Sequence, residues 1–330
     1  MKKRISIEEL VLGVKSNNIR LLGKAISLVE SKKPEHREQA EILLKEILPY
    51  TGQSVRIGIT GVPGAGKSTF IESFGKYAIA QGKKVAVLAI DPSSSLNQGS
   101  ILGDKTRMEE LAKDPNAFIR PSPSGGFLGG VANTTFETML LCEAAGYDLI
   151  LIETVGVGQS EVMVADISDV FLYLKVMGTG DELQGIKRGI MEMVDLIFIN
   201  KVEEENITLA KNTKLELMRA LYFITHKIED WKVPVVLGSA LENKGLQEIY
   251  QKITEFVALK KKKNIFDVER KIQAEKRFEY WVKELILART QSSEALKKAY
   301  LEHKKSASEL ERNPISEAQS FVNKLFKKEF

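Results

Sequence analysis

One run in the first quarter of the chain has residue types and spacing suited to holding a phosphate chain. Gly61 to Thr69 reads Gly-Val-Pro-Gly-Ala-Gly-Lys-Ser-Thr and fits the pattern G-x-x-x-x-G-K-[S/T]. The glycines let backbone N–H groups turn inward around a phosphate, where a side chain would collide with it. We expect the Lys67 ammonium to bridge the β- and γ-phosphates and the Ser68 hydroxyl to bind Mg²⁺. The predicted phosphate site consists of Gly61, Pro63, Gly64, Ala65, Gly66, Lys67, Ser68 and Thr69.

Three carboxylates could complete a magnesium site. Asp91 and Glu153 each directly follow a short apolar run, so we expect both at the carboxyl ends of strands, where ligands bind in open α/β sheets. Asp104 lies in a glycine-marked stretch and could equally be a turn residue. Oxygen ligands suit a hard cation that keeps several waters. The predicted metal ligands are Ser68, Asp91, Asp104 and Glu153, and the candidate catalytic groups are Lys67, Glu153 and Asp104.

Two later segments predict a site for a purine base. Asn200-Lys201-Val202-Glu203 resembles the N-K-x-D element that reads guanine. A carboxylate there can accept from the ring N–H and the exocyclic amine, whereas adenine would leave it unpaired at a cost. Ser239-Ala240-Leu241 matches the element whose backbone packs on the guanine carbonyl. Both together favour GTP, and Glu203, one methylene longer than aspartate, leaves a relaxed purine preference open.

These residues require a parallel sheet to position them. Short, nearly continuous apolar runs alternate with helical stretches, as expected for strands covered on both faces. The expected strands are Val55–Thr60, Val85–Ile90, Leu149–Ile152, Val170–Val176, Leu196–Ile199 and Val233–Leu237. The predicted fold class is therefore α/β, a doubly wound and mostly parallel sheet of the P-loop type.

Helical segments flank the predicted sheet domain. We predict an N-terminal helical extension over residues 1–53, the nucleotide domain over 54–258 and a C-terminal helical arm over 259–330. The arm has an apolar stripe that includes Phe278 and Leu285. Either the core or a second subunit must cover that stripe.

Composition narrows the class of protein. The 330 residues carry a net charge of +4, too small an excess to indicate nucleic acid as a partner. Cys142 is the single cysteine, which excludes an intrachain disulfide and fits a reducing compartment. No apolar stretch reaches the roughly 20 residues that a membrane span needs. We expect a cytoplasmic protein without a membrane partner.

Three distinctive runs, together with the phosphate loop, carry a family resemblance. They are Asp148-Leu149-Ile150-Leu151-Ile152-Glu153-Thr154-Val155-Gly156-Val157-Gly158-Gln159-Ser160-Glu161, Asp91-Pro92-Ser93-Ser94-Ser95 and Met177-Gly178-Thr179-Gly180-Asp181-Glu182-Leu183-Gln184-Gly185-Ile186-Lys187. They resemble the MeaB/ArgK family of P-loop GTPases over nearly the whole chain. Glu203 is the one clear departure, since the family usually has aspartate there.

The resemblance implies a homodimeric GTPase that serves an adenosylcobalamin-dependent acyl-CoA mutase, most commonly methylmalonyl-CoA mutase. Such a GTPase would gate the loading of intact cofactor. The resemblance also implies that Arg107 lies near the nucleotide, that the Gly178–Lys187 loop reports nucleotide state and that the C-terminal arm forms the dimer. The implied bound species are Mg²⁺ and GTP or GDP. The implied base contacts are Asn200, Lys201, Glu203, Ser239, Ala240 and Leu241.

Other interpretations stay open at this stage. Gln159 could position the attacking water or could simply be a polar side chain on the surface. We expect slow turnover until a partner orders the loops. An ArgK-type ATPase or kinase linked to amino-acid transport is the main alternative, although no phosphoacceptor motif is present. A metallocentre-insertion GTPase would carry Cys/His clusters, whereas the histidines His36, His226 and His303 are scattered. A nucleotide-binding subunit without turnover is a further alternative.

Overall fold

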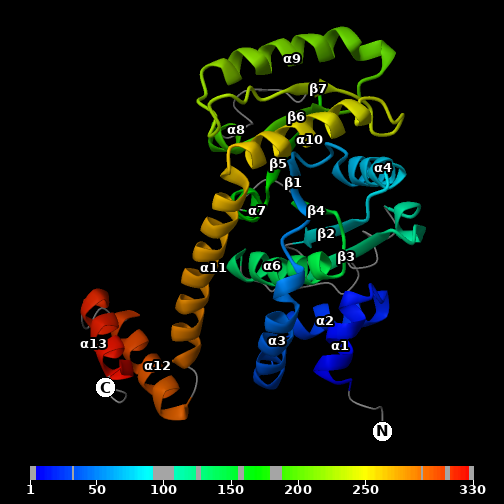
Figure 1. The fold of residues 1–330 in the computed structure, drawn as a ribbon. Helices are drawn as coiled ribbons and strands as arrows, with labels where there is room; N and C mark the ends of the chain where they lie inside the picture. Colours follow the sequence, from blue (N-terminus) through cyan, green and yellow to red (C-terminus); the bar gives the residue numbers. More distant parts are fainter. Residues whose placement is uncertain are drawn as a thin grey trace. The chain divides into compact units, whose positions relative to one another are not determined.

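The computed structural model describes residues 5–31, 33–91, 108–123, 128–154, 160–178, 188–290, 293–308 and 313–326. The chain divides into two compact units, Met1–Phe266 and Asp267–Phe330. The first unit contains the sheet and the predicted nucleotide site (Figure 1).

Within the described residues, seven strands form one sheet in the order β3-β2-β4-β1-β5-β6-β7, and every neighbouring pair is parallel. The predicted α/β class is confirmed. The strands are β1 (Val55–Gly61), β2 (Val85–Asp91), β3 (Ala117–Pro123), β4 (Leu149–Thr154), β5 (Val170–Lys175), β6 (Leu196–Ile199) and β7 (Val235–Leu237). Both faces are covered, which explains why these strands read as continuous apolar runs.

Strand β3 is absent from the sequence prediction. Among the described strands it pairs only with β2, at the edge of the sheet. Its segment Ala-Phe-Ile-Arg-Pro-Ser-Pro contains Pro121 and Pro123. Proline cannot donate to a strand ladder, so it normally argues against a strand. An edge strand tolerates proline because one of its sides has no strand to pair with.

One face of the sheet is covered by α4 (Lys67–Ala80) and α10 (Leu246–Lys262), whose buried side chains join those of the strands in one apolar cluster. Phe70, Phe74 and Phe256 are its largest fully buried helical side chains. Because α4 starts directly after the phosphate loop, this packing fixes the position of the loop.

The other face is covered by α6 (Leu128–Ala144), α7 (Ser160–Ile167), α8 (Arg188–Met193) and α9 (Ile207–Tyr222). The N-terminal helices α1 (Ile7–Lys15), α2 (Ile19–Val29) and α3 (Pro34–Ile47) pack on α6 as an outer layer (Figure 1). Ser6 and Asn18 accept hydrogen bonds from Glu9 N and Leu21 N and so cap α1 and α2.

The second unit contains most of α11 (Ile265–Arg289), together with α12 (Glu294–Ser308) and α13 (Pro314–Phe326). The last two helices pack on each other, with the rings of Tyr300 and Phe321 5.4 Å apart. His303 pairs with the buried Glu317 across the same contact.

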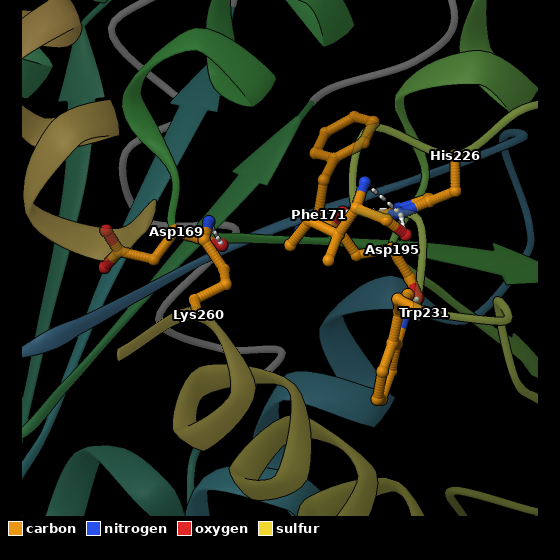
Figure 2. A network of polar contacts seen from close by, with 7 residues as sticks. Asp169, Phe171, Asp195, His226, Trp231 and Lys260 are labelled. Carbon is orange, nitrogen blue, oxygen red and sulfur yellow. Dashed lines mark hydrogen bonds and ion pairs between the residues drawn. The ribbon is translucent and has the colours of Figure 1, made fainter. Parts of the chain in front are cut away.

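A polar network closes the edge of the sheet where β5 and β6 begin (Figure 2). Asp195 accepts from the Phe171 backbone N–H at 2.7 Å, and its carbonyl accepts from the Trp231 indole at 2.8 Å. His226 Nδ1 accepts from Ile228 N, so its Nε2 donates to Asp195 at 3.1 Å. These contacts hold the segment before β7 against the amino ends of β5 and β6. The carboxyl ends of the strands lie at the other end of the sheet.

Candidate functional site

The loop between β1 and α4 has the backbone expected of a phosphate cradle. Gly64 and Gly66 have φ values of 81° and 83°, in the left-handed region that favours glycine. A Cβ on Gly66 would lie 2.6 Å from Asn200 Nδ2, so this glycine also permits a close contact with the next loop. Gly66 is the N-cap of α4, and the N-terminus of that helix faces the loop with its free N–H groups.

Lys67 is largely buried and bonds to its own loop. Its Nζ donates to the carbonyl oxygens of Gly61 at 2.9 Å and Val62 at 3.4 Å. Burial lowers the pKa of Lys67, while the carboxylates of Glu153 and Glu161 oppose that shift. Carbonyl contacts are weaker than those to a phosphate, so a bound triphosphate can take this ammonium from them.

The sequence analysis did not predict Glu161 as a residue of the site. It lies in the first turn of α7 and is buried, 1% exposed, within electrostatic range of Lys67 and of the Tyr173 hydroxyl. The sequence offered one signal for it, because Glu161 directly follows Gln159-Ser160 at the end of a run that carries the family resemblance. Burial, with a contribution from Glu161, raises the pKa of Tyr173 to about 12.

Two of the predicted metal ligands meet at the ends of the strands. The Ser68 hydroxyl donates to Glu153 Oε1 at 3.2 Å. Asp91 is the last residue of β2, whose Ala89 is in register with Glu153 on the adjacent β4. An alcohol and a carboxylate in contact are a donor set that fits Mg²⁺. The side chain of Asp91 and the residues Asp104, Arg107 and Gln159 lie outside the described part of the chain.

Asn200 connects the loops of the site. It follows β6 and is 2% exposed. Its Nδ2 donates to the Ala65 carbonyl at 2.9 Å, and its Oδ1 accepts from the Ala240 N–H at 2.9 Å. One buried amide therefore joins the phosphate loop to both predicted base loops.

Some of the predicted base residues around Asn200 are buried and others are exposed. Val202 N donates to the Gly238 carbonyl at 3.0 Å, which ties the two base loops together. Ser239 and Ala240 are buried behind this contact, whereas Lys201 and Glu203 are exposed. Leu241 is 78% exposed. The structure thus brings the predicted phosphate and base residues to one edge of the sheet.

This geometry defines a class of protein. A parallel α/β sheet with a glycine loop, a buried lysine at the start of the following helix and an Asn-Lys loop bonded to it is a P-loop GTPase.

Comparison with known proteins places the chain within this class. The sequence profile of the family described as "Methylmalonyl Co-A mutase-associated GTPase MeaB" matches residues 22–295. GTPase ArgK of Escherichia coli is 52% identical over 71% of this chain and 71% of its own. The mouse mitochondrial methylmalonic aciduria type A homolog is 46% identical over 77% of this chain and 64% of its own.

A crystal structure titled LAO/AO transport system kinase matches over 98% of this chain and 99% of its own, at 34% identity and a TM-score of 0.75. The chain belongs to the MeaB family of P-loop GTPases. The resemblance predicted from the motifs is confirmed, and the protein is a GTP hydrolase.

No helix in the described ranges is long and apolar enough to cross a membrane.

Proposed function

We propose that the chain couples GTP hydrolysis to the loading and protection of adenosylcobalamin in an acyl-CoA mutase, with methylmalonyl-CoA mutase as the first candidate. The observation that carries the proposal is the match of residues 22–295 to a mutase-associated GTPase family, on a chain whose phosphate and base loops share one buried amide. A change at the phosphates can thereby reach the base loops and the sheet edge around them.

The hydrolytic step follows from the residues at the loop. Water attacks the γ-phosphorus in line with the bond to the β-phosphate, which breaks to give GDP and phosphate. Lys67 moves from its carbonyl partners to the β- and γ-phosphates and stabilises their charge. The N–H groups of the loop and of the first turn of α4 bind the same oxygens. Bound Mg²⁺, held by Ser68, Asp91, Asp104 and Glu153, would neutralise further charge on the phosphates.

The segments proposed to respond to the nucleotide adjoin this site in sequence. Residues 155–159 follow β4, whose Glu153 contacts Ser68, and residues 179–187 follow the exposed Gly178. We propose that a mutase bound to these segments holds them in the conformation that hydrolysis needs. Gln159 remains the candidate that positions the attacking water.

A mutase is therefore expected to change the rate of hydrolysis. Phosphate release from GTP should be slow for the chain alone and rise about tenfold or more when an adenosylcobalamin-dependent mutase from the same cell is added. An unrelated protein at equal concentration is the control. A rate that no cobalamin mutase from that cell alters would contradict the coupling.

The similar crystal structure is named a kinase, so the affinities of this chain for GTP and ATP should be compared. The base site predicts tighter binding of GTP than of ATP. If ATP bound as tightly and its phosphate reached an acceptor protein, the transport-kinase alternative would replace the present proposal.

We also propose that residues 259–330 form a homodimer contact. Within the second unit, Phe278, Leu285 and Ile315 are exposed apolar side chains, and Phe278 is 70% exposed. Phe278→Asp is expected to shift the full chain from dimer to monomer in sedimentation velocity. A wild-type chain that sediments as a monomer at micromolar concentration would contradict this proposal.

A further inference from the structure

The loop that carries Glu203 has an unusual backbone. Lys201 has a φ of 62°, in the left-handed region that costs a non-glycine residue about 1 kcal/mol. Such a conformation persists only where neighbouring contacts hold it. The Val202 N–H bond to Gly238 is one such contact.

Side-chain packing gives this loop little support on one side. A hollow of about 310 Å³ adjoins it, lined by Val202, Glu203, Glu204, Ile207, Leu237, Gly238 and Lys244. The side chain of Glu203 is exposed. Its carboxylate accepts from the Asn206 backbone N–H, so the direction in which it points depends on how firmly the backbone of this loop is held.

The side chain of Asn206 holds the backbone of this loop. Its Oδ1 accepts from the Glu203 N–H at 2.9 Å, and its Nδ2 donates to the Lys201 carbonyl at 3.0 Å. Asn206 is the N-cap of α9 but makes no side-chain bond to the first turn of that helix. It is also the last residue of the 3-10 helix Glu204–Asn206, and its bond from Glu203 N is one half of a capping box with Glu203. Its amide is turned back onto the loop instead.

We propose that Asn206 is a positioning residue for base recognition: it fixes the Lys201–Glu203 backbone so that the Glu203 carboxylate meets the guanine edge. The inference rests on the base site proposed above. The asparagine amide carries an acceptor and a donor on one short rigid plane, which lets it make both bonds. The need is greater with glutamate than with aspartate, because each additional rotatable bond must be restricted when the carboxylate binds. The proposed role acts through Glu203 and requires no contact between Asn206 and the nucleotide.

The test compares the affinities for GDP and ADP, measured by calorimetry in the presence of Mg²⁺. For Asn206→Ala we expect GDP binding to weaken about tenfold, the net size of two ordinary hydrogen bonds, while ADP binding stays within about twofold. Asn206→Asp keeps the acceptor for Glu203 N but loses the donor to Lys201, so an intermediate loss of about threefold is expected. Asn212→Ala, exposed on the same helix, is the matched control and should match the wild type.

Different outcomes test the role of Asn206 and the guanine site separately. Equal weakening of GDP and ADP, or unchanged GDP binding in Asn206→Ala, overturns the role of Asn206 alone. If Asn206→Ala does not fold, the selectivity of Asn206→Asp decides in the same way. A wild type that binds GDP and ADP equally refutes the guanine site itself, and the positioning role with it.

Discussion

Lys67→Ala is expected to lower kcat/KM for GTP by about three orders of magnitude. The lysine is the buried cation of the phosphate loop, and its Nζ donates to the carbonyl oxygens of Gly61 and Val62. In the transition state the same ammonium would stabilise charge spreading over the transferred phosphoryl group. Alanine removes this interaction where little water can replace it. Phosphate release at several GTP concentrations measures the loss.

The control for this experiment lies on the same helix. Lys76 is exposed on α4, so Lys76→Ala removes one positive charge without touching the loop and should leave the rate unchanged. Circular dichroism of both variants checks that the helix is intact. If Lys67→Ala kept more than about a tenth of the wild-type rate, the assigned role of the lysine would be wrong.

Glu143→Ala is expected to cost about 3–5 kcal/mol of the free energy of unfolding. Glu143 lies near the end of α6 with a fully buried side chain, 2.8 Å from Arg56 Nε on β1. It also accepts from Gly52 N at 2.8 Å and from Ser54 Oγ at 2.6 Å. Alanine would remove the carboxylate from a buried guanidinium and from the buried Ser54 hydroxyl, and a buried donor that loses an acceptor is costly.

Urea unfolding followed by circular dichroism measures this cost. The exposed pair Lys113 and Glu110, 2.9 Å apart, is the matched comparison because both side chains are largely in water. Glu110→Ala should leave the urea midpoint unchanged. A Glu143→Ala midpoint equal to that of Glu110→Ala would show that the buried cluster contributes nothing to stability.

The local features of the fold could be predicted because their causes are local. β1, β2 and β4 are apolar on both faces, and such runs have few other stable environments. The phosphate loop could be predicted equally well, since its glycines, lysine and serine lie within a few residues of one another. The family resemblance rested on runs of the same local kind, and the comparisons confirmed it.

Features that depend on contacts distant in sequence could not be predicted. Strand β3 exists because β2 offers it a partner at the sheet edge, a pairing that its prolines conceal. Asn200 was expected only to hold the base, but it also bonds to Ala65, 135 positions away, and to Ala240. From the sequence, Asn206 looks like an ordinary residue at a helix start. Only the structure shows that its side chain bonds to the Lys201–Glu203 backbone.

By itself, the sequence determined the class of chemistry, because phosphate binding needs particular residues at fixed short spacing. It also determined the α/β class, because burial on both faces of a strand leaves a compositional pattern. Only the tertiary structure decided the order of the strands, the buried Glu143–Arg56 contact and the amide links between the loops. The physical reason is that hydrogen-bond partners and burial are properties of neighbours in space, which a linear pattern of residue types does not specify.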